Sequence, residues 1–84
     1  MAASLTPVVI GVDIGGTNTD VVIICHSHNR PEVLSEVKEF TTSDVTTGVK
    51  KGVLKALLQA KTRGHLVSPI QVNIGMGYVT SIYD

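Results

Sequence analysis

Residues 13–20 read Asp-Ile-Gly-Gly-Thr-Asn-Thr-Asp and stand between two apolar runs. These runs, residues 8–12 and 21–25, are rich in β-branched side chains and predict strands that are buried on both faces. So few residues separate the runs that the strands must form an antiparallel hairpin, because a parallel pair needs a long crossover connection. We therefore expect this octapeptide to lie at the tip of a hairpin.

The residues of this turn are suited to binding a phosphate. Gly15 and Gly16 let the turn adopt positive φ and let a ligand approach the main chain closely. Successive N–H groups in such a turn form a concavity that binds anions, and threonine hydroxyls add donors. The predicted phosphate-binding residues are Gly15, Gly16, Thr17, Asn18 and Thr19. An ordinary hairpin turn is the alternative interpretation, because Gly, Asn and Asp are common turn residues.

Two carboxylates flank the turn. Asp13 precedes the glycines and Asp20 opens the second strand. Carboxylate oxygens and water are the ligands that a hydrated divalent cation prefers. We predict that Asp13 holds Mg²⁺ through water and that Asp20 is a second candidate ligand, which could instead brace the loop. The octapeptide as a whole predicts a site for a nucleotide phosphate with magnesium.

The composition favours one small globular domain. The chain has 84 residues, of which 43% are hydrophobic and 17% charged, and its net charge is zero. No basic excess points to a nucleic acid, and apolar runs of this length are far shorter than the ~20 residues that span a bilayer. A single cysteine excludes an intramolecular disulfide, and no basic residue precedes the first apolar run. We expect a cytoplasmic protein that binds neither nucleic acid nor membrane.

The second half of the chain predicts a strand, a helix and a strand. Residues 32–40 form a weaker strand whose charges suggest an edge position. A helix follows over residues 44–62, with Ser43 as N-cap, Asp44 in the first turn and Gly64 as its stop. Gly48 and Gly52 inside this helix predict a close approach to the sheet. Residues 70–74, after Pro69, alternate like a strand, whereas residues 1–7 are expected to be disordered.

Three glycine-rich phosphate-binding designs can be compared with the octapeptide. The dinucleotide-binding fingerprint opens a helix, whereas Gly15 and Gly16 open a strand. The mononucleotide-binding loop requires a lysine after the glycines, and none follows. The third design, D-x-G-G-T between the first two strands, is the phosphate hairpin of the actin-like ATPase and sugar-kinase superfold. Its motif and its order of strand, strand, strand, helix and strand both match.

Within that superfold, residues 8–75 resemble the N-terminal region of the hydantoinase/oxoprolinase family. Residues 10–22 are similar to the family pattern G-x-D-x-G-G-T-x-T-D-x-V. Lys38, followed by Thr41, Thr42 and Gly48, resembles a K-x-x-T-T-P stretch and the helix glycine after it. After Gly75 the pattern departs, because the threonines of the family's I-G-T-T are absent. Residues 76–84 are accordingly expected to be a divergent tail, and the chain to be an α/β, ribonuclease-H-like partial domain with a mixed sheet.

The resemblance implies chemistry as well as a fold. The family's enzymes open cyclic amides, such as 5-oxoproline or hydantoins, at the expense of ATP and with Mg²⁺. The resemblance implies that Asp13 holds the metal, that the loop N–H groups hold phosphate oxygens, and that Thr17 and Thr19 add hydrogen bonds. The adenosine and cyclic-amide contacts are expected outside this chain, in a longer parent protein. We expect the isolated chain to have little or no catalytic activity.

Two other interpretations stay open. The chain could be a non-catalytic fragment that binds phosphate weakly or self-associates through exposed sheet edges, or part of a sugar kinase of the same superfold. The remaining reactive side chains favour structural roles. His26 and His28 suggest a solvated turn more than a metal site, and Cys25 suggests a small buried residue. His65 is placed to favour the helix C-terminus.

Overall fold

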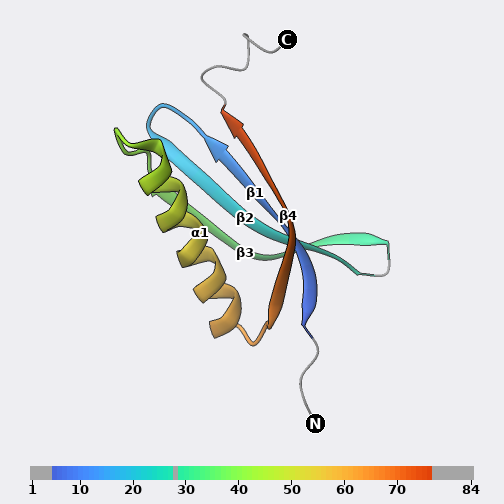
Figure 1. Cartoon of the computed structure of the whole chain (residues 1–84). Helices are drawn as coiled ribbons and strands as arrows, with labels where there is room; N and C mark the ends of the chain where they lie inside the picture. The colour runs from blue at the N-terminus through green and yellow to red at the C-terminus, as the bar shows by residue number, and fades with distance from the viewer. Residues whose placement is uncertain (1–4, 28, 77–84) are drawn as a thin grey trace.

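The fold is one mixed sheet with one helix on one of its faces (Figure 1). The computed structural model describes residues 5–27 and 29–76. The strand order is β3-β2-β1-β4, with β1 antiparallel to β2 and parallel to β4, and β2 antiparallel to β3. This arrangement confirms the predicted α/β class and the order of elements. The elements are β1 (Thr6–Ile14), β2 (Asn18–Ser27), β3 (Arg30–Phe40), α1 (Val45–Thr62) and β4 (Val67–Met76).

The first strand begins earlier than the apolar run suggested. Thr6 and Pro7 lie in β1 and pair with Val67 and Ser68 of β4. The N–H of Thr6 also donates to the Leu66 carbonyl oxygen at 2.7 Å. The sequence predicted disorder for these two residues. Their pairing partners lie about sixty residues away in the chain, so no local pattern reveals the pairing. Residues 1–4 of that segment, and residues 77–84 of the expected tail, lie outside the described residues.

Strand β4 also extends beyond its predicted start and includes Pro69. Pro69 pairs with Val8, but the next pair is Val9 with Gln71, so Ile70 is an extra residue at a register shift. Proline has no N–H to donate, and sheets accept it on edge strands and at bulges. Both conditions hold here, because β4 is the edge strand beside β1. The proline therefore interrupts the register of the strand without ending it.

The helix begins one residue later than predicted. Asp44, not Ser43, is the N-cap: its Oδ1 accepts from the Thr46 N–H at 3.2 Å and its Oδ2 from the Thr47 hydroxyl at 2.8 Å. Aspartate and serine cap equally well, so the sequence could not separate them. The predicted stop at Gly64 is confirmed. Gly64 has φ of +89°, and the N–H of His65 bonds to the Ala60 carbonyl oxygen, which closes a Schellman motif.

Small residues bring α1 close to the sheet, as its two glycines predicted. The buried face of α1 consists of Gly48, Gly52, Ala56 and Ala60. A Cβ on Gly52 would lie 2.8 Å from Cγ2 of Val21. The same helix face covers the core, which contains Val8, Ile10, Val12, Ile14, Val21, Ile23, Cys25 and Leu34. Asp13, Asp20 and Lys38 alternate with core residues in their strands, so they lie on the opposite face of the sheet.

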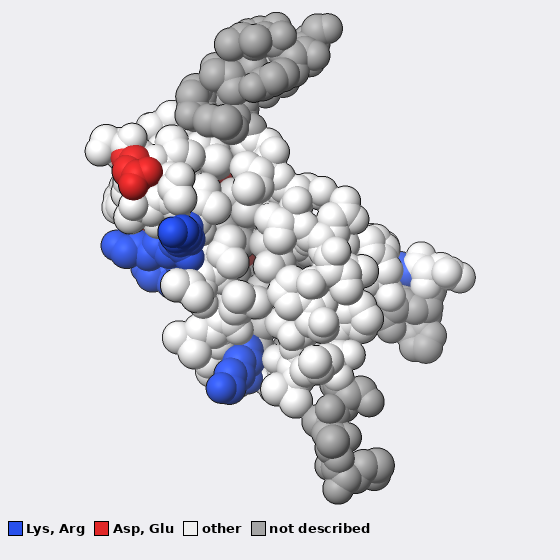
Figure 2. Space-filling view, viewed as in Figure 1, with Lys and Arg blue, Asp and Glu red and all other residues white. Residues whose placement is uncertain are grey.

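Polar contacts fasten α1 to β3 at the rim of this core. The buried Ser35 hydroxyl donates to the Ala56 carbonyl oxygen at 2.8 Å. Lys55 Nζ donates to Glu39 Oε2 at 2.8 Å, and this hydrogen bond holds the pKa of the Glu39 carboxyl below its ordinary value. The lysines of α1 are all exposed, and Figure 2 shows Lys and Arg side chains on the helix side of the molecule. Within the described chain, no helix is long and apolar enough to cross a membrane.

The contact between Gly52 and Val21 yields a stability prediction. We expect Gly52→Ala to lower the free energy of unfolding by about 1–3 kcal/mol, because the added methyl overpacks the helix–sheet contact. This is the net change, after the roughly 1 kcal/mol by which alanine exceeds glycine in helix propensity has been subtracted. Urea unfolding followed by circular dichroism measures the change. The control Lys51→Ala, on the exposed side of α1, should change it by less than about 0.5 kcal/mol, and a more stable Gly52→Ala would contradict the prediction.

Candidate functional site

Residues 15–17 form the tip of the β1–β2 hairpin. Figure 1 shows this tip at the same end of the molecule as the N-terminus of α1 and the C-terminal end of β4. The Gly15 N–H donates to the Asn18 carbonyl oxygen at 2.9 Å, and a Cβ on Gly15 would lie only 3.1 Å from that oxygen. A Cβ on Gly16 would have no atom within 4 Å. Gly15 therefore makes the turn tight, and Gly16 leaves its outer side open.

The expected positive φ at these glycines is wrong. Among the described glycines, only Gly64 has positive φ. The pair is thus used for space and not for a left-handed backbone. At Gly15 the missing Cβ permits close approach of the Asn18 carbonyl oxygen, and at Gly16 it gives a ligand access to the main chain. A sequence pattern cannot distinguish these uses, because glycine serves all of them.

The N–H groups of this loop differ in availability. The Gly15 N–H, which was expected to hold a phosphate oxygen, is engaged within the turn. For the N–H groups of Gly16 and Thr17, no acceptor is found among residues 5–27 and 29–76. Gly16 and Thr17 are exposed, whereas Asn18 is half-buried at the start of β2. Two adjacent main-chain donors are therefore unpaired within the described part of the chain, as an anion site requires.

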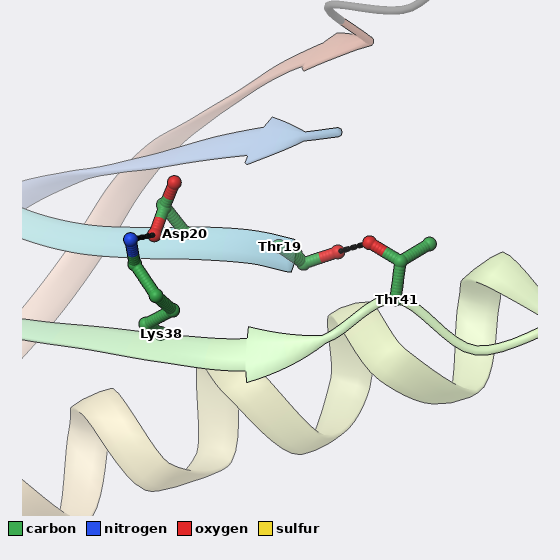
Figure 3. A network of polar contacts seen from close by, with 4 residues as sticks. All are labelled: Thr19, Asp20, Lys38 and Thr41. Atoms are coloured by element: carbon green, nitrogen blue, oxygen red, sulfur yellow. Dashed lines mark hydrogen bonds and ion pairs between the residues drawn. The ribbon is translucent and has the colours of Figure 1, made fainter. Parts of the chain in front are cut away.

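Thr41, in the connection between β3 and α1, holds the loop in place (Figure 3). Its N–H donates to the Thr17 carbonyl oxygen at 2.8 Å, and its hydroxyl donates to the Gly15 carbonyl oxygen at 2.8 Å. Since that hydroxyl has one proton, Thr19 is the donor in the 3.0 Å contact between Thr19 Oγ1 and Thr41 Oγ1. Thr19 is only 1% exposed, so its hydroxyl braces the loop in this structure.

The start of α1 is tied to the same connection. The Thr42 hydroxyl donates to the Asp44 carbonyl oxygen and accepts from the Gly48 N–H at 3.0 Å. A Cβ on Gly48 would lie 3.0 Å from Thr42 Oγ1, so glycine makes room for this contact. Thr41 thus faces the loop and Thr42 faces the helix. Through these neighbouring threonines, the position of α1 sets the position of the hairpin tip.

Asp13 and Asp20 lie opposite each other on the sheet face away from α1. They are paired residues of β1 and β2, and side chains of such pairs stand ~4.5–5.5 Å apart at Cβ. Asp20 is in turn paired with Lys38 of β3, and Asp20 Oδ1 lies 3.8 Å from Lys38 Nζ. Figure 3 shows the other oxygen of Asp20 on the side of β1. The structure therefore brings together the two carboxylates that the sequence singled out.

These side chains border an open concavity of about 710 Å³. Its floor is the backbone at Gly11 and Gly75, which are paired with Asn73 and Asp13 across β1 and β4. Because these two positions have no side chain, the surface is hollow between the strands. The polar residues that line it are Asp13, Asp20, Glu36, Lys38 and Asn73. The concavity offers carboxylates, an amide and an ammonium to a ligand beside the loop.

The fit to a magnesium nucleotide follows from this donor set. Within the described ranges, no group of three or more His, Cys, Asp and Glu side chains is placed to hold a metal. Mg²⁺ bound to a nucleotide needs only one or two carboxylates, because water and phosphate complete its octahedron. Asp13 and Asp20 meet that requirement, and the N–H groups of Gly16 and Thr17 suit the phosphate. The residues present therefore fit the group, provided that metal and phosphate come together.

The other reactive side chains lie apart from this site. Cys25 is buried, as expected, and its Sγ is 4.0 Å from Glu32 Oε2. His26 is exposed at the far end of β2, while His28 lies outside the described residues. His65 follows the end of α1, at the opposite end of the helix from the loop. Within the described chain, neither His26 nor His65 contributes to the concavity.

Sequence reasoning missed the roles of Thr41, Lys38 and Asn73. Thr41 and Lys38 were noted only as part of a family-like stretch, and Asn73 only as a strand residue. Each lies more than fifteen residues from the octapeptide, and only strand pairing brings it near. A local signal was available only for Asn73, a polar residue in the largely apolar strand β4. Lys38 lies in a strand already rich in charged residues, and Thr41 lies in a connection, so neither stands out locally.

The Thr41 contacts yield a second prediction. We expect Thr41→Val to lower the free energy of unfolding by about 1–3 kcal/mol, because it leaves the buried Thr19 hydroxyl and the Gly15 carbonyl oxygen without their partner. The amide of Thr17 should also exchange with solvent faster relative to core amides. Chemical denaturation and hydrogen exchange by NMR measure both effects. Thr41→Ser should behave like wild type, as should Thr46→Val on the exposed helix turn; a stable Thr41→Val with an unchanged loop would refute the role.

The comparisons with known proteins agree with this geometry. Residues 9–77 match the family described as the hydantoinase/oxoprolinase N-terminal region. A search of curated proteins returned no match. The family match includes β1 from Val9 onward, the loop, β2, Thr41, α1 and β4. It therefore covers both the loop and the carboxylate-bearing sheet face, and the chain belongs to the hydantoinase/oxoprolinase family as an N-terminal region of that family.

Proposed function

We propose that this chain supplies the phosphate-binding wall of an ATP-dependent enzyme that opens cyclic amides of the hydantoin or 5-oxoproline type. The observation that carries the proposal is the braced hairpin tip, where two main-chain donors have no acceptor among the described residues and lie next to paired aspartates. Membership of the family supports the class of enzyme. Nucleotide and cyclic amide would meet in the full-length parent, with the adenosine and amide contacts supplied by other parts of it.

Each residue of the loop has a distinct role in this proposal. The N–H groups of Gly16 and Thr17 bind phosphate oxygens, and the exposed Thr17 hydroxyl can add a donor. Gly15 and Thr19 act indirectly, since their hydrogen bonds to Asn18 and Thr41 fix the shape of the loop. Asn18 borders the same tip. Positioning of this kind is the main contribution of a protein to phosphoryl transfer, because the protein takes little part in the covalent chemistry.

Asp13 and Asp20 provide the negative charge that Mg²⁺ requires. Asp13 is exposed and faces the concavity, so it can hold the ion through water. When bound, ATP would supply a phosphoryl group to the amide oxygen, so that water can attack the amide carbon and the ring C–N bond can break with release of phosphate. This chain orients the phosphates and balances their charge. The need for ATP, together with a single free cysteine, supports a cytoplasmic location.

Binding of magnesium ATP to the purified chain tests the proposal. We expect submillimolar affinity by titration calorimetry and no hydrolysis of 5-oxoproline, because this chain carries only one wall of the cleft. Asp13→Asn should weaken binding at least tenfold, a loss of ~1.4 kcal/mol for a charged metal ligand. Glu32→Gln removes one negative charge far from the loop and should leave the affinity unchanged. Wild-type binding that survives Asp13→Asn would overturn the assignment of the metal ligand.

A non-catalytic role in self-association is the second candidate function. The outer edge of β4 is unpaired among the described strands, and Val72 and Ile74 are 51% and 56% exposed there. The helix packs mainly on β2 and β3; of β4, Val67 packs against the core but Ile70, Val72 and Ile74 are exposed, and few charged side chains lie between α1 and β4 in Figure 2. Exposed apolar edge strands pair readily with other strands. We propose a second copy as the partner, with β4 against β4, because this closed pair uses the same patch twice.

Light scattering distinguishes the two candidate functions. We expect a concentration-dependent dimer of the purified chain, and Ile74→Lys should return it to a monomer, because a charge on the edge strand opposes pairing. Leu58→Lys is the matched control on the outer side of α1, where Leu58 is 64% exposed. It should leave the dimer intact. A chain that is monomeric at all concentrations would remove this second candidate function.

A further inference from the structure

The cation nearest to the paired aspartates is Lys38, and the proposed function gives it no task. Its ammonium lies 3.8 Å from Asp20 Oδ1, beyond hydrogen-bond distance, and the two side chains are 67% and 46% exposed. The other ion pair, between Lys55 and Glu39, is a true hydrogen bond at 2.8 Å. The contact between Lys38 and Asp20 is thus the looser of the two, and it can be exchanged for another at little cost.

Electrostatics explain why a cation stands here. Asp13 and Asp20 are directly opposite across β1 and β2, and like charges in that arrangement destabilise a sheet. Lys38 continues the same row on β3, so its charge offsets that repulsion when no metal is bound. A divalent cation between the aspartates would offset it more strongly. Once the metal is present, the ammonium of Lys38 is no longer needed by Asp20.

A phosphate bound at the hairpin tip would lie within reach of the Lys38 side chain. Lys38 stands two residues from Phe40, which pairs with Asn18 at the hairpin tip, a separation of about 7 Å along β3. Its side chain is long, flexible and borders the concavity. Phosphate oxygens bound by the Gly16 and Thr17 N–H groups would place negative charge next to this concavity.

We infer that Lys38 exchanges partners when a magnesium nucleotide binds: it leaves Asp20, which turns to the metal, and its ammonium moves to the phosphate oxygens. The inference rests on the proposed function and adds a phosphate-binding residue to it. It also gives Asp20 a different role in each state of the site. Asp20 is a brace for Lys38 in the empty site and a metal-side carboxylate in the occupied one.

Partner exchange makes a prediction that charge alone does not. Asp20→Asn should raise the affinity for metal-free pyrophosphate about three- to tenfold, because Lys38 is released and one negative charge is lost. The same variant should lower the affinity for magnesium ATP by a similar factor, because the metal loses a carboxylate. Lys38→Met should weaken both ligands, and Lys38→Arg should restore much of the binding. A general change in charge would instead shift both ligands in the same direction for Asp20→Asn.

Titration calorimetry of the full chain with pyrophosphate plus EDTA, and separately with magnesium ATP, tests this reversal. Glu36→Gln is the matched control, since it removes one carboxylate from the same concavity outside the row of Asp13, Asp20 and Lys38. This variant should change the affinities for both ligands in the same direction, or change neither affinity. Suppose that Asp13→Asn weakens the binding of magnesium ATP, but that Asp20→Asn changes the affinities for pyrophosphate and magnesium ATP in the same direction. Partner exchange is then wrong and the proposed function stands. If wild type binds no magnesium ATP, both fail.

Discussion

Close packing of α1 on β2 and β3 is the constraint on which the rest of the molecule depends. At Gly52 the helix approaches so near that a single added carbon would lie 2.8 Å from Val21. Protein interiors packed at this density transmit small displacements, because they contain few voids that could absorb them. The position of α1 therefore fixes the connection that precedes it. That connection holds Thr41 and Thr42, which fasten the hairpin tip to the helix start.

The same packing divides the sheet into two chemically different faces. One face is covered by α1 and holds the aliphatic core, including Val21 and Ile23. The other carries the row of Asp13, Asp20 and Lys38 above a floor of glycine backbone. Neighbouring residues in β2 show the division most clearly. Thr19 is buried and braces the loop, whereas Asp20 is half-exposed and faces the concavity.

Much of this architecture was predictable from local patterns. The apolar runs on either side of residues 13–20 predicted the hairpin, and the spacing of small and apolar residues predicted the helix. Gly64 ended that helix through its positive φ. The errors have physical causes. Thr6 and Pro7 join β1 because β4 pairs with them, and Pro69 lies within β4 because an edge strand tolerates a missing donor.

By itself, the sequence determined the order of elements, the hairpin at Gly15 and Gly16, and the family, because all three depend on residues that are neighbours in the chain. Only the tertiary structure decided which groups of the site are free. It engaged the Gly15 N–H within the turn and turned the Thr19 hydroxyl toward Thr41. It also set Lys38 beside Asp20. The Gly15 contact is local, but the contacts of Thr19 and Lys38 join residues distant in the chain, and strand register and the depth of helix packing, not local composition, bring those residues together.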